Sequence, residues 1–176
     1  AMDAFLAEVA GGVHGAELAT VHPTAIIEGD VRLGEGVAVE PFAWIRGPAW
    51  IGAGVTIGHG ALLRGGCVLA DGATVGHASE VKHSLLLAGA KAPHFNYVGD
   101  AILGAGVNLG AGVKIANLRN DGAAVRVGTT TTGLRKFGGA FGDDVHVGCN
   151  AVLGPGALVG ARTSVYAGAV VRGVIE

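Results

Sequence analysis

The sequence predicts an all-β protein that winds as a parallel β-helix, with short strands joined by tight turns and coil stacked on coil. Two observations predict it: an aliphatic residue recurs at every sixth position, and 33 of the 176 residues are glycine while only 5% are aromatic. A period of six fits neither the 3.6-residue α-helix nor the two-residue alternation of a simple strand. It fits three six-residue units per triangular coil, with the strands of successive coils about 4.8 Å apart.

The aliphatic ladder is expected to form the core. Each step should point inward and pack on the step eighteen residues later, so that no coil is stable alone. Residues two positions before the steps are small or branched, and glycine often follows a step, where a turn requires positive φ. The steps are Val21, Ile27, Leu33, Val39, Ile45, Ile51, Ile57, Leu63, Leu69, Val75, Val81 and Leu87.

The first eighteen residues lie outside this repeat. Ala1 before Met2 is interpreted as an expression-tag scar, and residues 3–10 (DAFLAEVA) place apolar side chains on one helical face before Gly11. We therefore expect residues 1–18 to hold the scar and a short capping helix, and residues 19–176 to form the β-helix. Acidic side chains in the helix argue against a signal peptide.

Composition excludes several classes of partner. The formal net charge is −2 and no basic run is present, so neither nucleic acid nor an anionic membrane surface is expected. No segment approaches the roughly eighteen apolar residues that span a bilayer. Cys67 and Cys149 are too few for a disulfide framework and lack the spacing of metal ligands, so a reducing cytoplasm is the expected location.

Two interruptions break the ladder. It resumes at Leu103, sixteen residues after Leu87, so two residues are predicted to be missing from one coil. The regular coil of the β-helix is therefore expected to be distorted over Lys91–Asp100 (KAPHFNYVGD). The second interruption, near 118–139, holds NDG, four threonines and a basic pair, and predicts a polar loop extruded from the wall. The hexads close the chain at Phe141, Val147, Leu153, Val159, Val165 and Val171.

His94 lies within the first interruption and is the candidate for chemistry. An imidazole takes a proton near neutral pH, and the neighbouring Lys91, Tyr97, Arg64 and Lys82 suit general-base catalysis on an anionic amine substrate. The alternative is an irregular surface loop with solvated charges. Arg64 and Lys82 are eighteen residues apart and so share one column, an arrangement suited to a phosphate monoester unless an acid such as Glu80 neutralises them.

The stretch from Ser79 to Asn117 carries a more specific signal. Its Lys-x-x-His-x-x-Tyr-x-Gly-Asp pattern resembles the acetyltransferase half of the bifunctional sugar-1-phosphate nucleotidylyltransferase/acetyltransferases, and IANLRNDG with TGLRKFGGAFGDDVHVG is similar to their archaeal-type branch. The resemblance covers most of the chain from about residue 20. It implies a left-handed β-helix, which periodicity alone does not give, a cytoplasmic enzyme of UDP-N-acetylglucosamine biosynthesis, and acetyl-CoA as co-substrate.

The resemblance also implies roles for particular residues. His94 would be the catalytic base that takes a proton from the 2-amine of an amino-sugar 1-phosphate, glucosamine-1-phosphate or galactosamine-1-phosphate, as the amine attacks the acetyl thioester. The implied substrate-binding residues are Arg64, Lys82, Lys91, Tyr97, Asn108 and Asn117. The implied CoA-binding residues are Ala111, Cys149 and Ala167 along the coil edge, to which we add the basic pair Arg135 and Lys136.

The chain departs from the family pattern in several places. Leu118 stands where the bacterial branch has tyrosine, and Arg126 is the nearest candidate for a missing family lysine. The chain ends without the bacterial CoA-binding tail, and no Gly-rich nucleotide loop precedes the helix. The alternative function is therefore a non-catalytic trimeric scaffold or sugar-nucleotide-binding module that has lost its nucleotidylyltransferase partner domain.

Two further expectations concern metals and assembly. His59 and His77, eighteen residues apart, are interpreted as solvated turn histidines. The other interpretation is a zinc site like that of the gamma-class carbonic anhydrases, but the histidine spacing of those proteins is absent, so no metal is expected. His14 and His22 lie near the cap, and His83 and His146 alternate with inward residues and should face outward. Flat prism faces with outward apolar residues, in a family whose sites span adjacent subunits, predict a closed homotrimer.

Overall fold

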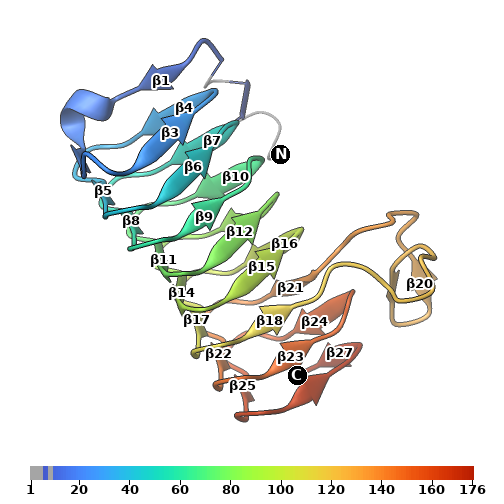
Figure 1. The fold of residues 1–176 in the computed structure, drawn as a ribbon. Coiled ribbons are helices and arrows are strands. Elements are labelled where there is room, and N and C mark those ends of the chain that lie inside the picture. The colour runs from blue at the N-terminus through green and yellow to red at the C-terminus, as the bar shows by residue number, and fades with distance from the viewer. Residues whose placement is uncertain (1–5, 8–9) are drawn as a thin grey trace.

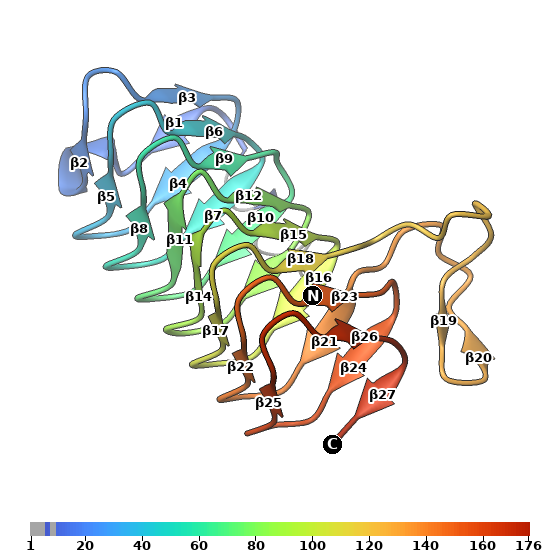
Figure 2. The same ribbon diagram turned by 60° about the horizontal axis from the view of Figure 1, so that its bottom comes forward.

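The computed structural model describes residues 6–7 and 10–176, which wind into the expected left-handed parallel β-helix. Three parallel sheets form the faces of a triangular prism, and each coil contributes a strand to each face (Figures 1 and 2). The predicted capping helix over residues 3–10 lies mostly outside the described residues. β1 already pairs with β4 in the register Val13↔Val31, so the first coil starts at Val13, and a short 3₁₀ helix, η1 (Ala16–Leu18), follows it.

Strand bounds follow the hexads closely. The first sheet contains β1 (Val13–His14), β4 (Val31–Leu33), β7 (Ala49–Ile51), β10 (Cys67–Leu69), β13 (Leu85–Leu86), β16 (Ala101–Leu103), β21 (Gly139–Phe141), β24 (Ala157–Val159) and β27 (Val174–Ile175). The second sheet contains β2 (Thr20–Val21), β5 (Ala38–Val39), β8 (Thr56–Ile57), β11 (Thr74–His77), β14 (Lys91–His94), β17 (Asn108–Leu109), β22 (His146–Val147) and β25 (Ser164–Val165). The third sheet contains β3 (Ile26–Glu28), β6 (Trp44–Arg46), β9 (Leu62–Leu63), β12 (Glu80–Lys82), β15 (Tyr97–Gly99), β18 (Lys114–Ile115), β23 (Val152–Leu153) and β26 (Val170–Val171).

The core is the predicted ladder of aliphatic side chains. In the first coils each residue pairs with the one eighteen positions later, as in Val39↔Ile57 and Ile45↔Leu63. Ile45, Ile51 and Ile57 are fully buried. Because nearly every inward position is a short aliphatic residue, the prism is filled almost without aromatic side chains.

The predicted position of the first interruption is wrong. Leu86, not Leu87, points into the core with 0% exposure, and the inward spacing of six then continues through Ala92 and Val98. Two successive coils are each one residue short, since the pairs Leu69↔Leu86 and Leu86↔Leu103 are both seventeen apart. The prediction that one coil lacks two residues is therefore corrected: two successive coils each lack one residue.

Both losses occur where the third sheet turns into the first. One turn passes through His83 and the next through Asp100, and both residues have positive φ, at 47° and 49°. Most of KAPHFNYVGD instead forms the regular strands β14 and β15. Ser84 is buried beside the first of these turns, where its hydroxyl donates to the Lys82 carbonyl and accepts from the Ala101 amide.

The second interruption is confirmed as an extruded loop. From about residue 116 to 138 the chain leaves the prism and forms a small antiparallel hairpin, β19 (Arg126–Val127) with β20 (Thr130–Thr131), that stands away from the coils (Figures 1 and 2). An isolated bridge between Leu118 and Lys136 closes the root of the loop. Within the described residues no helix is long and apolar enough to cross a bilayer.

Candidate functional site

The turns that join the second sheet to the third form one straight edge of the prism, which we call the His94 corner (residues 94–96 and their equivalents in other coils). His94 is the last residue of β14, and its carbonyl accepts from the Gly112 amide at 2.9 Å. The Ala111 and Cys149 carbonyls accept in the same way from the next coils, at 2.8 Å each. The backbone therefore stacks His94, Ala111, Cys149 and Ala167 in a single column.

Small side chains continue this column beyond His94. Cys149 and Ala167 are exposed. The column therefore consists of small residues that lead along the coils to an exposed imidazole. Sequence resemblance had implied these residues separately, and the fold aligns them.

Asn96 braces the turn that presents His94. It is 2% exposed, its Oδ1 accepts from the His94 amide at 3.0 Å, and its Nδ2 donates to the Gly110 carbonyl at 2.8 Å. Its own amide donates to the Ser79 hydroxyl at 3.1 Å. One buried side chain therefore ties three coils together directly behind the candidate base.

Above His94 the same edge carries a ladder of rings. His59 and His77 are exposed, as expected for turn histidines, and their Nδ1 atoms lie 3.1 Å apart. Phe42 packs edge-on against His59, and Phe95 packs edge-on against His77. Among the described residues no group of three or more His, Cys, Asp or Glu side chains is placed to hold a metal ion.

The opposite edge of the third sheet, where it turns into the first, is the Asp100 corner (residues 99–101 and their equivalents in other coils). Arg64 and Lys82 occupy successive coils here, as predicted, but each has a carboxylate partner. Arg64 Nη1 lies 2.8 Å from Glu80 Oε1, and this hydrogen bond raises the pKa of the Arg64 guanidinium further above its usual value. Lys82 Nζ lies 3.1 Å from Asp100 Oδ2.

Asp100 is a candidate site residue that the sequence analysis did not single out. Besides Lys82, it pairs with His83 Nδ1 at 3.3 Å, accepts a short hydrogen bond from Asn117 Nδ2, and its carbonyl accepts from the Gly138 amide. It thus binds the coil above, the coil below and the root of the loop. The available signal was the Gly-Asp that ends KAPHFNYVGD, because Asp100 lies eighteen residues after Lys82 and so falls beside it one coil later.

Tyr97 and Asn117 converge on Gly99. A Cβ at Gly99 would lie 2.7 Å from the Tyr97 hydroxyl and 2.8 Å from Asn117 Nδ2, so a larger residue there would displace these two polar groups. Together with Lys82 and Asp100 they form a compact polar cluster at the Asp100 corner. Four of the expected substrate-binding residues, Arg64, Lys82, Tyr97 and Asn117, therefore gather on one side of the third sheet.

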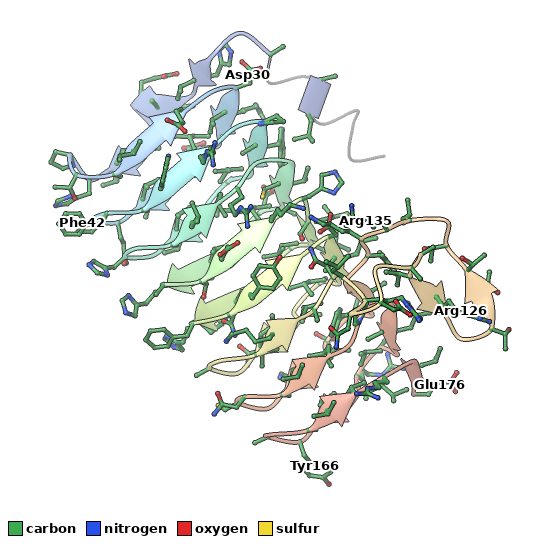
Figure 3. The ribbon with its side chains drawn as sticks, turned by 45° about the vertical axis from the view of Figure 1, so that its right-hand side comes forward. Asp30, Phe42, Arg126, Arg135, Tyr166 and Glu176 are labelled. Carbon is green, nitrogen blue, oxygen red and sulfur yellow. The ribbon has the colours of Figure 1, made fainter. Side chains whose placement is uncertain are left out.

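The remaining predicted residues lie elsewhere. Lys91 and Asn108 are register partners on the outer face of the second sheet. Arg135 and Lys136 lie at the root of the extruded loop beside the coils, while Arg126 is out in the hairpin (Figure 3). A groove of about 600 Å³ lies below the root, and Leu118 and Arg119 are among its lining residues.

Within one chain the candidate base and the candidate phosphate ligands start from different edges of the third sheet. The chain runs along β15 from Phe95 to Asp100, and at about 3.3 Å per residue this stretch spans about 16 Å of backbone. Arg64 pairs with Glu80, which begins β12 on the side of the His94 corner, so the guanidinium leans across the outer face of the sheet toward that corner. The two sets of side chains therefore lie at opposite edges of one face of the prism.

The chain is thus a hexapeptide-repeat β-helix with a polar cluster on one edge and an exposed histidine column on another. No family model matches it. It is 43% identical over 97 residues to the bifunctional sugar-1-phosphate nucleotidylyltransferase/acetyltransferase of Sulfurisphaera tokodaii, a match that covers 53% of this chain and 24% of that protein. It is 39% identical over 100 residues to the bifunctional protein GlmU of Methanococcus vannielii, a match that covers 55% and 24%.

These relatives confirm the resemblance found in the sequence, although the chain spans only about a quarter of their length. Solved structures are more distant. The match to LpxA from Acinetobacter baumannii covers 93% of this chain and 71% of that one, with 16% identity and a TM-score of 0.47. The match to a mutant of GDP-perosamine N-acetyl transferase from Caulobacter crescentus covers 90% and 53%, with 20% identity and a TM-score of 0.33. Likenesses of this size carry no argument about function.

Proposed function

We propose that this chain is an acetyl-CoA-dependent N-acetyltransferase that acts on an amino-sugar 1-phosphate, glucosamine-1-phosphate or galactosamine-1-phosphate. The observation that carries the proposal is the column at the His94 corner, where an exposed imidazole stands at the head of a path of small residues. The similarity to a bifunctional sugar-1-phosphate nucleotidylyltransferase/acetyltransferase supports the same reaction class.

In the proposed reaction His94 is the general base. The neutral imidazole accepts a proton from the 2-amine as the nitrogen attacks the thioester carbonyl, and a C–N bond forms. The tetrahedral intermediate then collapses, the C–S bond breaks, and the proton passes to the CoA sulfur. Asn96 holds the backbone of His94 in place, so the turn does not have to be ordered anew when the substrates bind.

The phosphate is proposed to bind at the Asp100 corner. The Arg64 guanidinium has five N–H donors and the Lys82 ammonium three, and their carboxylate partners use only some of them. However, the four groups sum to no net charge, because Glu80 and Asp100 balance the two cations. A dianionic phosphate would therefore also need a cation from outside this cluster.

In a closed homotrimer, a neighbouring chain would supply the base and the additional cation that the Asp100 corner of one chain lacks. Stacking His94 from one chain against the Arg64 and Lys82 edge of its neighbour would bring the base within reach of a sugar whose phosphate is held there. Cyclic symmetry would repeat this arrangement at three equivalent interfaces. Lys91 and Arg135 are the cations proposed to complete the anion sites for phosphate and CoA across that interface, whereas Lys136 lines a separate pocket.

One observation favours the alternative of a non-catalytic scaffold: Arg64 and Lys82 are each neutralised within the chain. A thiol-release assay with acetyl-CoA separates the two functions. The enzyme should release CoA thiol with glucosamine-1-phosphate or galactosamine-1-phosphate far faster than with free glucosamine. No release above background with any amino sugar would leave only the scaffold. Equal rates on phosphorylated and free sugars would remove the phosphate from the mechanism.

A further inference from the structure

A second pocket lies between the outer face of the first sheet and the root of the extruded loop. It has a volume of about 280 Å³ and is lined by His83, Leu85, Asp100, Ala101, Ile102, Leu134, Lys136 and Phe137. It opens on the Asp100 corner, across the third sheet from His94. The proposed acetyl transfer uses the column at His94 and leaves the apolar part of this pocket without a role.

The walls of the pocket are apolar and come from two separate elements. Leu85 and Ile102 are register partners on neighbouring strands of the first sheet. Leu134 and Phe137 belong to the returning arm of the loop. Ile102 is 43% exposed and Leu134 is 53% exposed, so both present apolar area that a bound apolar group would cover.

The rim of the pocket carries one carboxylate, Asp100, and one ammonium group, Lys136. Asp100 is the acidic residue among those that line it, and its carboxylate is already occupied by Lys82 and Asn117. Across the part of the chain that the structure describes, no acidic side chain lies within ion-pair distance of Lys136. The Lys136 ammonium therefore remains available to an anion, whereas the Nδ1 atom of the exposed His83 ring is already paired with Asp100.

We propose that this pocket binds a small amphipathic anion, with an apolar body against Leu85, Ile102 and Phe137 and an acidic group at Lys136. Such a ligand would contact both the sheet and the loop. Occupancy would therefore fix the root of the loop against the coils. This binding site is independent of the acetyl transfer proposed above and requires no reaction.

The test uses 2-naphthalenesulfonate and its neutral counterpart 2-naphthol, titrated by fluorescence against the full chain. One saturable site per chain is expected, with the sulfonate bound more tightly and its affinity falling as salt rises. Lys136→Gln should weaken the sulfonate about fivefold and leave 2-naphthol unchanged. Arg135→Gln, which changes the neighbouring cation outside the pocket lining, should change neither.

The apolar wall is tested by a second matched pair on the same loop. Leu134→Ala should weaken both probes about fivefold or more, because both lose buried contact. Leu118→Ala, which alters the larger groove on the other side of the loop root, should affect neither. These variants are at exposed positions, so they are expected to fold.

Several results would overturn the proposal. Equal affinity for the two probes, or equal effects of Lys136→Gln and Arg135→Gln, would show non-specific apolar binding. Failure to saturate would show that the pocket is closed, for example by a second copy of the chain. Displacement of the sulfonate by CoA would assign the pocket to the acetyl-CoA site. Since none of these readouts needs turnover, a failure here is distinct from a failure of the proposed acetyl transfer.

Discussion

Asp100 and Asn96 show how single polar residues organise this prism. Each is bonded to the coil above and the coil below, and each stands directly beside a candidate functional group. Asn96 is buried, so its amide must be fully bonded to avoid the cost of an unsatisfied polar group. The site residues are therefore held by hydrogen bonds between coils and not by the turns alone.

His94→Ala is predicted to lower turnover by about 10² to 10⁴-fold, because the amine would lose its proton acceptor. The thermal midpoint should hardly change, since the ring is exposed and Asn96 bonds only the backbone of His94. His77→Ala is the matched control: His77 pairs with His94 in register, is exposed, and should be dispensable. Steady-state kinetics and thermal melts check both variants, and full activity of His94→Ala would remove it as the base.

The two cysteines are predicted to differ sharply in reactivity. Cys67 is fully buried, and burial raises the pKa of its thiol to about 11, so at pH 8 it is neither ionised nor accessible. Cys149 is exposed at the His94 corner. Alkylation of the folded chain should modify Cys149 alone, and acetyl-CoA should slow it if the cofactor lies along that corner. Mass spectrometry of peptides from native and unfolded samples makes the comparison.

Among the elements, the regular strands were predictable and the shortened turns were not. Up to Val81 each hexad has one aliphatic step, so the register was visible in the sequence. Leu85, Leu86 and Leu87 are consecutive, and counting cannot tell which of them points inward. The structure selects Leu86, because the turn through His83 is one residue shorter than the turn before it.

One part of the site was overlooked. Asp100 lies eighteen residues after Lys82, the same spacing that places Lys82 after Arg64, but its role as the partner of that lysine was not predicted. The contents of the site were nevertheless largely given by the Lys-x-x-His-x-x-Tyr-x-Gly-Asp pattern. Only the structure shows which edge of the prism carries each of these residues, because the register of the coils depends on the length of every turn.

The extruded loop begins with a local ion pair whose pH dependence can be predicted. The Arg119 guanidinium donates two hydrogen bonds to Asp121 and lowers the pKa of that carboxyl to about 2, from an ordinary value of 3.8. A carboxyl with a lowered pKa stabilises the folded loop above its ordinary pKa, and that contribution is lost as the pH falls from about 4 through about 2. The pair is exposed, so the loop and not the β-helix should respond.

Carbon-detected NMR titration of the Asp121 carboxyl checks this prediction. The wild-type chain should titrate with a midpoint near pH 2, and Arg119→Gln should return the midpoint to near 4. Arg126→Gln, in the hairpin further along the loop, is the control and should leave the Asp121 midpoint unchanged. A wild-type midpoint already near 4 would mean that the ion pair does not persist in solution.

For the whole molecule, the proposal is that each site is shared between neighbouring chains, with His94 from one chain and the phosphate ligands from the next. A single chain holds His94 on one edge and Arg64 with Lys82 on the other, about 16 Å apart along β15. The protein is therefore predicted to run as a homotrimer at micromolar concentration in sedimentation or light-scattering measurements. A monomeric mass together with full activity would contradict the shared site.

Subunit complementation tests the shared site most directly. His94→Ala and Arg64→Ala chains, each expected to be nearly inactive alone, are mixed in equal amounts, unfolded together and refolded, and thiol release is measured. If each site takes His94 from one chain and Arg64 from the next, random trimers should regain about a quarter of wild-type activity, because half of the chains carry each intact residue. If both residues served the same chain's site, the mixture would stay as inactive as its components, and the account would be wrong.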